Sequence, residues 1–384
     1  MSFALAALAL LALALTLWQW IEGRRFPLHR RVSAPSFAPP LTLLKPLKGA
    51  DPHTATCLRS WLAQDYPGPV QLLFGVTAPT DTASETVRSL LAEFPHADAQ
   101  LVICPDALGP NAKVSKLAQL EPLAKYHLLV VSDADVRVPP DFLTNLVAPL
   151  QDPVVALVNP LYRLANPTTL PMRWEALAVN ADFWSSVLQA RRLAPLAFAL
   201  GAVMAVRRQA LENIGGFKTL VEYLADDFQL GHRLARRGAR LALCPAVVDC
   251  LEPPLGWRAV WHHQLRWART IRVCRPLPYA LSILSNPTLW PLLWLAAQPR
   301  GPARYGAALC FVVRLLTAAD NQRRLTQSLT HLPWLWLAPI KDLLQFILWA
   351  LAFLGNRVEW RDQRYRVDRG GKLVTEDRTV KRET

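Results

Sequence analysis

The chain has 384 residues, enough for one large or two medium domains together with membrane elements. Hydrophobic residues make up 52% of it, which is high for a soluble enzyme and low for a transporter with many membrane spans. The formal net charge of +14 favours anionic partners, and because the arginines crowd beside apolar segments and no nucleic-acid-binding motif is present, we expect a bilayer or phosphorylated substrates and no nucleic acid.

The first predicted element is a transmembrane anchor over residues 1–23. Residues 5–20 are almost continuously apolar, and about twenty apolar residues suffice for a helix to cross a bilayer. No basic residue precedes this run, which is unlike a cleaved signal peptide. Arg24 and Arg25 follow it, so the positive-inside rule places this end, and the domain after it, on the cytosolic face.

A basic, proline-rich linker is expected over residues 24–40, and a catalytic α/β domain over 41–276. Apolar runs predict strands, and they alternate with helical patterns. Strands are predicted at 41–47, 70–76 and 100–104 and within 127–135, and helices at 54–64, 82–94 and 113–124. Such alternation predicts a Rossmann-like, mostly parallel sheet. Ligands bind such sheets beyond the carboxyl ends of the strands.

Residues 277–356 are predicted to form membrane-associated helices. Their apolar stretches cover about 279–297, 303–319 and 332–354, and are interrupted by Pro287, Arg314, Lys341 and Asp342. Ionisable residues within a span usually face protein or water, so one stretch is expected to lie on the surface and two to cross. This multi-pass arrangement returns a basic tail, 357–384, to the cytosol.

The six cysteines show no metal-binding spacing and are expected to be buried free thiols in a reducing compartment.

Two carboxylates directly follow the predicted strand at 127–135. Asp133 and Asp135, at positions i and i+2, can bind Mg²⁺ or Mn²⁺ together with a diphosphate, because these ions prefer oxygen ligands and keep bonds to substrate phosphates. Such a cation would stabilise charge on the departing diphosphate. The same residues also suit a polar turn or a helix cap.

A second acidic pair, Asp226 and Asp227, precedes a helical pattern. These acids either favour the helix N-terminus electrostatically or supply a general base. An acceptor hydroxyl is a poor nucleophile, and a carboxylate within hydrogen-bond reach can take its proton. Asp227 is the candidate base, and Asp226 is an additional site candidate.

Three further segments carry candidate binding residues. His263, Arg266 and Trp267 offer cationic and aromatic groups for phosphate or sugar, or belong to a basic amphipathic helix on lipid headgroups. Lys113 opens a helix after a glycine–proline turn and would place a cation near phosphate, unless the turn is a plain loop. Asp81 follows the strand at 70–76 and would reach the uracil or ribose, unless it is an ordinary surface acid.

Taken in order, these segments resemble the ceramide glucosyltransferase family and its bacterial relatives. The matching segments are LLKPLKG (43–49), the Asp81 segment, GPNAKVSKL (109–117), SDADVRV (132–138), GAVMAVRR (201–208), LADDF (224–228), HQLRW (263–267) and VEWRDQRYRV (358–367). The resemblance implies a GT-A catalytic domain and inversion at the anomeric carbon.

The resemblance also implies roles for individual residues. It gives Asp81 a nucleotide contact, Asp133 and Asp135 the metal and diphosphate, and Asp227 the role of base. Lys113 is assigned with them to the donor site. Arg266 and Trp267 match the last two positions of the family's (Q/R)xxRW motif, also on the donor side. His263 stands at its first position, where the family has Gln or Arg, so its role is open.

The predicted function is transfer of a sugar, glucose as first choice, from a UDP-sugar to the hydroxyl of a ceramide-like membrane lipid. The alternatives are a hopanoid glycosyltransferase that uses UDP-N-acetylglucosamine, a processive polysaccharide synthase, and a non-catalytic membrane protein or transporter. The expected partners are the lipid acceptor and the bilayer. The sequence predicts neither the oligomeric state nor the exact number of crossings.

Overall fold

A computed structural model describes residues 2–32, 37–360, 363–368 and 370–375. Parts of the predicted linker and tail, residues 33–36 and 376–384, lie outside this range. The described chain forms two compact units that are interleaved in sequence, whereas the sequence suggested one uninterrupted catalytic segment, 41–276. The sheet unit, as we call it, comprises residues 27–166 and 194–253, and the helical unit comprises residues 1–26, 167–193 and 254–384.

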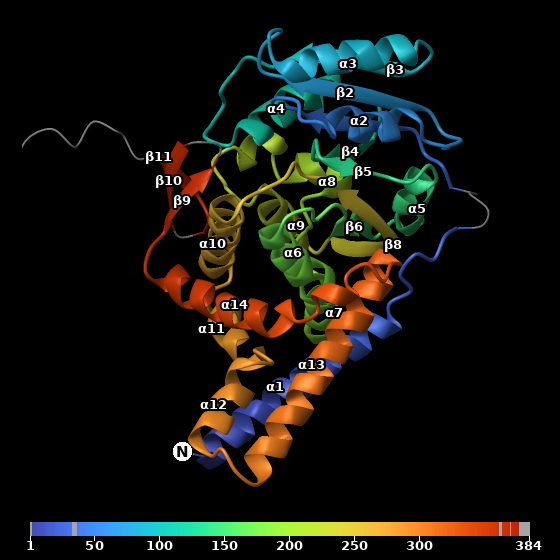
Figure 1. Ribbon diagram of the computed structural model, residues 1–384. Helices are drawn as coiled ribbons and strands as arrows, with labels where there is room; N and C mark the ends of the chain where they lie inside the picture. The colour runs from blue at the N-terminus through green and yellow to red at the C-terminus, as the bar shows by residue number, and fades with distance from the viewer. Residues whose placement is uncertain (1, 33–36, 361–362, 369, 376–384) are drawn as a thin grey trace, which may run out of the picture. The chain divides into compact units, whose positions relative to one another are not determined.

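An eight-stranded sheet forms the centre of the sheet unit (Figure 1). Its strands, in spatial order, are β3 (Asp98–Ile103), β2 (Val70–Val76), β1 (Leu41–Pro46), β4 (Leu128–Ser132), β7 (Val203–Arg207), β6 (Val155–Leu164), β8 (Arg240–Cys250) and β5 (Val136–Arg137). The first four strands are parallel, as predicted. The sheet as a whole is mixed, because β7 runs antiparallel to both its neighbours and β5 runs antiparallel to β8. Apolar patterning predicts that a strand exists but does not fix its direction.

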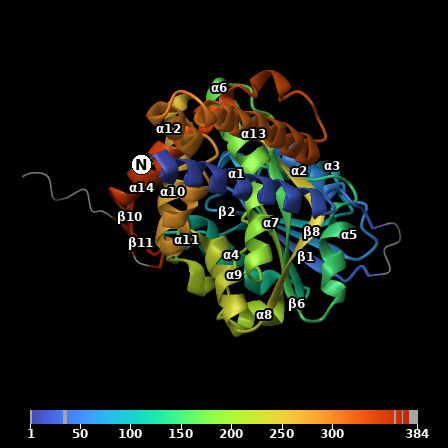
Figure 2. The same ribbon diagram turned by 90° about the horizontal axis from the view of Figure 1, so that it is seen from below.

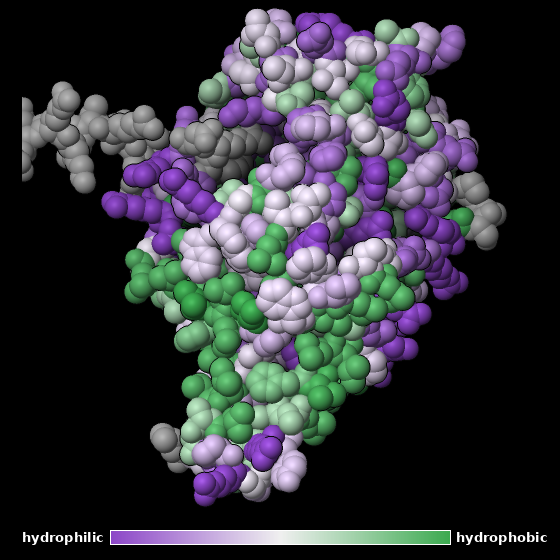
Figure 3. Space-filling view, viewed as in Figure 1, coloured by the Kyte–Doolittle hydropathy of each residue, from purple (hydrophilic) through white to green (hydrophobic). Residues whose placement is uncertain are grey.

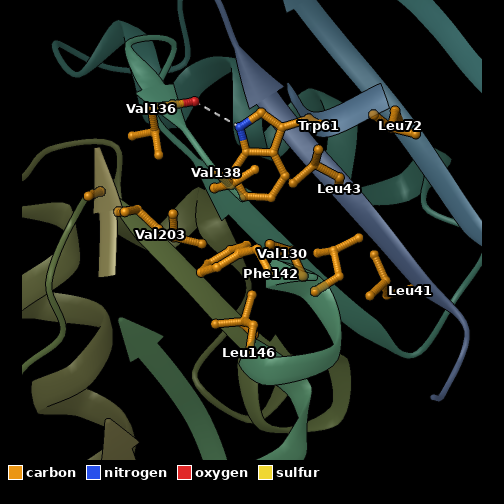
Figure 4. Close-up of a cluster of buried hydrophobic side chains, with 14 of the residues drawn as sticks. Leu41, Leu43, Trp61, Leu72, Val130, Val136, Val138, Phe142, Leu146 and Val203 are labelled. Carbon is orange, nitrogen blue, oxygen red and sulfur yellow. Dashed lines mark hydrogen bonds between the residues drawn. The ribbon is translucent and has the colours of Figure 1, made fainter. Parts of the chain in front are cut away.

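The helices of the sheet unit follow the ends of its strands. They are α2 (Thr54–Leu62), α3 (Thr82–Glu93), α4 (Ala112–Leu120), α5 (Phe142–Val147), α8 (Arg208–Asn213) and α9 (Asp226–Arg236). Trp61 of α2 illustrates how they pack: it is fully buried, meets Phe142 of α5 edge to face and donates a 2.9 Å hydrogen bond to the Val136 carbonyl (Figure 4). The alternating apolar residues of β1 and β4 complete this core.

The helical unit begins with α1 (Ser2–Arg25), which packs beside two helices from the other end of the chain (Figures 1 and 2). Its other helices are α6 (Leu170–Leu177), a π-helix (Ala178–Phe183), α7 (Trp184–Leu193), α10 (Trp257–Cys274), α11 (Pro276–Leu281), α12 (Leu289–Ala297), α13 (Pro302–Thr326) and α14 (Leu337–Phe353). The buried face of α1 includes Ala9, which packs against Trp294 of α12 and Ala303 of α13. Small residues on a helix let neighbouring helices approach closely.

Among the described residues, α1 is long and apolar enough to cross a membrane. Residues 276–285 and 289–297 meet the same criterion only as one pair, bent by 52° near Pro287. The second and third apolar stretches predicted within 277–356, which correspond to α13 and α14, do not meet this criterion. The charged residues that interrupt them lie inside the protein, as expected for ionisable groups in an apolar segment.

Those charged residues form one buried cluster. Arg314 of α13 forms a bidentate pair with Asp182 of the π-helix, at 2.8 Å for both contacts, and a 2.8 Å pair with Asp342 of α14. Lys341 contacts the same two aspartates, at 2.5 and 2.8 Å. The Thr288 hydroxyl donates a hydrogen bond to Asp342. Ion pairs therefore join α13, α14 and the π-helix, and this hydrogen bond links the turn before α12 to the same cluster.

Part of the predicted tail is folded. Residues 357–375 contain the antiparallel strands β9 (Arg357–Trp360), β10 (Gln363–Val367) and β11 (Leu373–Thr375). Arg269 and Arg272 of α10 donate to Arg357, Gly355 and Asn356 at the start of this sheet. The part of the tail that the structure describes is therefore a small antiparallel sheet and not a plain basic extension.

Candidate active site

Two of the acidic residues singled out from the sequence within the sheet unit, Asp133 and Asp226, contact one lysine. Asp133 follows β4, Asp226 begins α9, and Lys113 lies in the first turn of α4. The Lys113 Nζ atom lies 2.7 Å from Asp133 Oδ1 and 3.4 Å from Asp226 Oδ2. Burial alone would lower the pKa of Lys113, but the Asp133 and Asp226 carboxylates outweigh it and raise the pKa. Lys113 is therefore charged and links two acidic segments that are far apart in sequence.

Asp135, two residues beyond Asp133, lies in a more strongly anionic environment. Burial, followed by the negative charges of Asp133 and Glu252, raises the pKa of Asp135 to about 7, although Lys45 partly opposes the shift. Asp135 therefore lacks a full positive counter-charge among the described residues, and it lies two residues from Asp133. The donor set of Asp133 and Asp135 therefore fits a hard divalent cation that completes its shell with water and substrate phosphate. The described residues contain no group of three or more His, Cys, Asp or Glu able to hold a metal by themselves.

Asp227, the predicted base, adjoins this group. Burial and the Asp226 carboxylate raise the pKa of Asp227 to about 6, while Lys113 partly lowers it. Its Oδ1 atom accepts a 2.7 Å hydrogen bond from the backbone of Phe228. A carboxylate with a pKa close to neutral is well matched to accept a proton from a hydroxyl group and remains mostly ionised at pH 7.

The raised pKa of Asp227 predicts the acid limb of the pH profile. A base must be deprotonated to act, so kcat/KM should be constant above about pH 7 and fall about tenfold per pH unit well below 6. Initial rates from pH 4.5 to 8.5, with folding checked at each pH, measure this limb. A limb centred near pH 4, the ordinary value for an aspartate, would contradict the environment assigned to Asp227.

The loop before β7 leaves room for the Asp227 carboxylate. A Cβ atom added at Gly201 would lie 2.9 Å from Asp227 Oδ2, closer than such atoms approach in folded proteins. Glycine at this position therefore keeps space beside the candidate base. The segment GAVMAVRR was part of the family resemblance, but the sequence did not show why it begins with glycine.

The Gly201→Ala variant should lower kcat about tenfold, because the added Cβ would push the Asp227 carboxylate out of position and misplacing a catalytic group carries a cost of this order. Steady-state kinetics would show the loss, with thermal unfolding confirming the fold. Gly256→Ala is the matched control, since a Cβ there would meet nothing within 4 Å. Equal rates for the two variants would show that Gly201 does not protect the position of Asp227.

Asp81 has a local structural role in the described chain. It is the N-cap of α3, and its Oδ1 atom accepts hydrogen bonds from the backbone of Ala83 at 3.0 Å and of Gly49 at 2.9 Å. The Gly49 contact connects α3 to the loop after β1. Both bonds use one carboxylate oxygen, so the predicted nucleotide contact would have to use the remaining hydrogen-bonding capacity of the side chain.

Two supporting residues were missed from the sequence. Lys45 of β1 is fully buried, and its Nζ atom donates to Ser132 Oγ at 3.1 Å and to the Asp133 carbonyl at 2.5 Å. Asn111 is also fully buried and caps α4. Its Nδ2 atom donates a 2.8 Å hydrogen bond to the carbonyl of Tyr223, just before the Asp226 segment. An asparagine directly before a helical pattern is a capping signal that identifies Asn111. A lysine within an apolar strand is the corresponding signal for Lys45.

The remaining predicted residues lie on α10, in the helical unit. His263 and Trp267 are one helical turn apart, and their rings meet edge to face with centroids 4.4 Å apart. Arg266 lies on the same helix. His263 Nδ1 is 2.8 Å from Oε1 of Glu175, a buried acid of α6 that sequence reasoning did not single out. A glutamate among apolar residues in the pattern PMRWEAL was the available signal.

The model of glycosyl transferase family 21 matches residues 3–373 of the chain. Ceramide glucosyltransferase 3 of Caenorhabditis elegans is 24% identical over 368 residues, which cover 91% of this chain and 77% of that protein. Ceramide glucosyltransferase 1 of the same species is 25% identical over 226 residues, 57% of this chain and 47% of that protein, so the match spans about half its length. A ceramide glucosyltransferase of Candida albicans is 36% identical over 121 residues, covering 29% and 22% of the two chains.

A solved structure supports the fold. The mannosyltransferase PcManGT from Pyrobaculum calidifontis, in complex with GDP-Man and Mn²⁺, superposes with a TM-score of 0.54 at 25% identity and covers 89% of this chain and 97% of its own. The predicted GT-A-like α/β fold and the predicted resemblance to ceramide glucosyltransferases are thereby confirmed, as is the prediction of a glycosyltransferase. The match over residues 3–373 shows that the chain belongs to glycosyl transferase family 21.

Proposed function

We propose that the chain transfers a sugar, glucose as first choice, from a UDP-sugar to the hydroxyl of a ceramide-like membrane lipid, with inversion at the anomeric carbon. The observation that carries this proposal is the position of Asp227, a carboxylate with a pKa near neutral beside the Lys113–Asp133 pair. A base and a diphosphate-binding group within one acidic cluster are what a single displacement requires. The names of the relatives supply the acceptor and the sugar.

In this reaction each residue has one task. Asp227 takes the proton of the acceptor hydroxyl while the hydroxyl oxygen bonds to the anomeric carbon and the bond from that carbon to the UDP leaving group breaks. Lys113, charged and already paired with Asp133, exchanges part of that pairing for the donor diphosphate. Asp133 and Asp135 would hold a divalent cation, which when bound stabilises negative charge on the leaving group. Lys45 and Ser132 keep the Asp133 backbone in place. Asp81, Arg266 and Trp267 are assigned to donor binding by the family resemblance.

The distribution of apolar surface supports a membrane acceptor. Large exposed hydrophobic side chains lie mainly in the helical unit, among them Leu292, Leu309, Leu316 and Ile347. Figure 3 shows hydrophobic residues gathered over the region of α12, α13 and α14. Contiguous exposed apolar surface of this kind marks contact with a membrane or another protein. We infer that α1 anchors the chain in the bilayer, that the helices of residues 277–356 lie in or on it, and that the sheet unit faces the cytosol.

Transfer assays with purified protein test the function directly. UDP-glucose, UDP-N-acetylglucosamine and GDP-mannose would each be offered with ceramide, with a hopanoid and with no lipid, and nucleotide release and lipid product would be measured. Ceramide with UDP-glucose should give the highest kcat/KM, and chelation with EDTA should lower the rate until Mg²⁺ or Mn²⁺ is restored. Absence of transfer to every lipid would overturn the proposal, and preference for the hopanoid would reassign the acceptor.

Tryptophan fluorescence provides a test of the membrane placement. Of the 14 tryptophans, seven fall within residues 1–23 and 277–356, namely Trp18, Trp20, Trp290, Trp294, Trp334, Trp336 and Trp349. Reconstitution into lipids brominated along their acyl chains should therefore quench a substantial part of the emission. Lipids without bromine are the control. Emission that is no more quenched than in the control would place these tryptophans away from the acyl chains.

A further inference from the structure

Glu175 is a buried acid that the proposed reaction does not use. It lies on α6, is 1% exposed, and its Oε1 atom accepts a 2.8 Å hydrogen bond from Gln264 Nε2. The same oxygen is 2.8 Å from His263 Nδ1. Its second oxygen, Oε2, is buried without a hydrogen-bond partner among the described residues. A buried carboxylate that is only half satisfied is an unfavourable choice for stability alone.

The packing around Glu175 fixes its position. Its neighbour Trp174 is fully buried and stacks on Trp261 of α10, with centroids 6.3 Å apart. Met172 of α6, Val260 of α10 and Leu348 of α14 belong to the same apolar cluster. The two helices that carry Glu175 and His263 are therefore held together by apolar contacts independent of the carboxylate.

The contact with Glu175 determines which nitrogen of His263 is available. A carboxylate oxygen accepts hydrogen bonds and donates none, so Nδ1 of His263 carries the hydrogen. In the neutral ring, Nε2 then keeps its lone pair and is a hydrogen-bond acceptor. The His263 side chain is 21% exposed, and its ring meets the ring of Trp267 at 4.4 Å.

We propose that Glu175 is a positioning residue that holds His263 Nε2 as a hydrogen-bond acceptor beside the Trp267 ring, forming a subsite for a hydroxyl-bearing substrate. An aromatic ring packs against the C–H face of a sugar or a polar lipid head, and an adjacent acceptor takes the hydrogen of a hydroxyl group. The subsite rests on the proposed glycosyl transfer. The hydroxyl belongs either to the donor sugar or to the lipid acceptor, since both present this chemistry.

A histidine at this position differs from the Gln or Arg of the family's motif in needing a partner to fix its tautomer. Where the family's motif begins with Gln or Arg, the side chain carries its own donors and needs no partner to set a tautomer. Histidine requires one, because either ring nitrogen can hold the hydrogen. Glu175 supplies this function in the present chain.

A double-mutant cycle tests the proposal through substrate binding. Glu175→Leu should raise KM about tenfold for one of the two substrates, the equivalent of one hydrogen bond, with kcat changed much less. KM is measured separately for UDP-sugar and for lipid, so the affected substrate identifies the source of the hydroxyl. In the His263→Phe background the same change should add almost nothing, because Glu175 then has no imidazole to orient. Glu175→Gln, which keeps an acceptor oxygen, should restore most of the affinity.

Histidine ¹⁵N spectra test the positioning without relying on activity. The His263 signal, assigned by its loss in His263→Phe, should show hydrogen on Nδ1 in the wild type and a shift toward hydrogen on Nε2 in Glu175→Leu. An unchanged tautomer, or an equal KM effect of Glu175→Leu in both backgrounds, overturns the inference. Loss of all transfer in the wild type would instead overturn the proposed function, while the spectra would still decide the tautomer.

Discussion

Asp227→Asn is expected to lower the rate of sugar transfer about 10²–10⁴-fold, the usual contribution of a general base. The substitution keeps the shape of the side chain and an oxygen able to accept from the Phe228 backbone. It removes the ability to bind a proton from the acceptor hydroxyl. Donor KM should change little, because Lys113 and Asp133 remain in place. Steady-state kinetics with saturating lipid measure both values.

Asp98→Asn is the control for Asp227→Asn. Asp98 is a half-exposed acid of the same sheet unit that pairs with Lys125, and its removal should leave kcat within about twofold of the wild type, as for most exposed ion pairs. If Asp227→Asn retains near-normal kcat while folded, another group activates the hydroxyl and the raised pKa of Asp227 has a different purpose.

Arg314→Met is expected to destabilise the helical unit by about 3–5 kcal/mol, the typical cost of removing one partner from a buried ion pair. Arg314 is 3% exposed and contacts both Asp182 and Asp342. Without it, the buried Asp342 and the partly buried Asp182 share Lys341 as their cationic partner. Tryptophan fluorescence during thermal unfolding in detergent reports this unit almost exclusively, because it holds 13 of the 14 tryptophans.

Arg366→Met provides the comparison for Arg314→Met. Arg366 pairs with Asp368 on the C-terminal sheet with side chains 55% and 48% exposed, so its loss should cost no more than about 1 kcal/mol. Similar melting temperatures for the two variants would show that the buried cluster contributes nothing specific to the helical unit.

Much of the sheet unit could be predicted from the sequence because its signals are local. The strand at 70–76 coincides with β2, and the helices after the first strands begin within one residue of their predicted starts. The antiparallel direction of β7 could not be predicted, since it depends on where the chain returns in space. For the same reason the interleaving of the two units was missed, as residues 167–193 join the terminal segments through contacts distant in sequence.

The sequence identified the acids of the candidate site but could not predict how they are arranged in space. Asp133 and Asp226 are 93 positions apart, and only the fold brings both within reach of Lys113. Gly201, Lys45 and Glu175 were not identified, because each acts through a group distant in sequence: Gly201 leaves space for Asp227, Lys45 donates to the Ser132–Asp133 segment, and Glu175 contacts His263. The sequence led us to expect that Arg314, Lys341 and Asp342 face protein or water, but not that Arg314 and Lys341 also contact Asp182.

The central claim is that the Asp133, Asp135 and Asp227 carboxylates of the sheet unit perform sugar transfer onto a membrane lipid. Mass spectrometry of total lipids from cells that express either the wild-type chain or Asp227→Asn addresses it in one measurement. The account predicts a lipid heavier by one hexose with the wild type and its near absence with the variant at equal expression. Identical lipid profiles in wild-type, variant and empty-vector cells would contradict it.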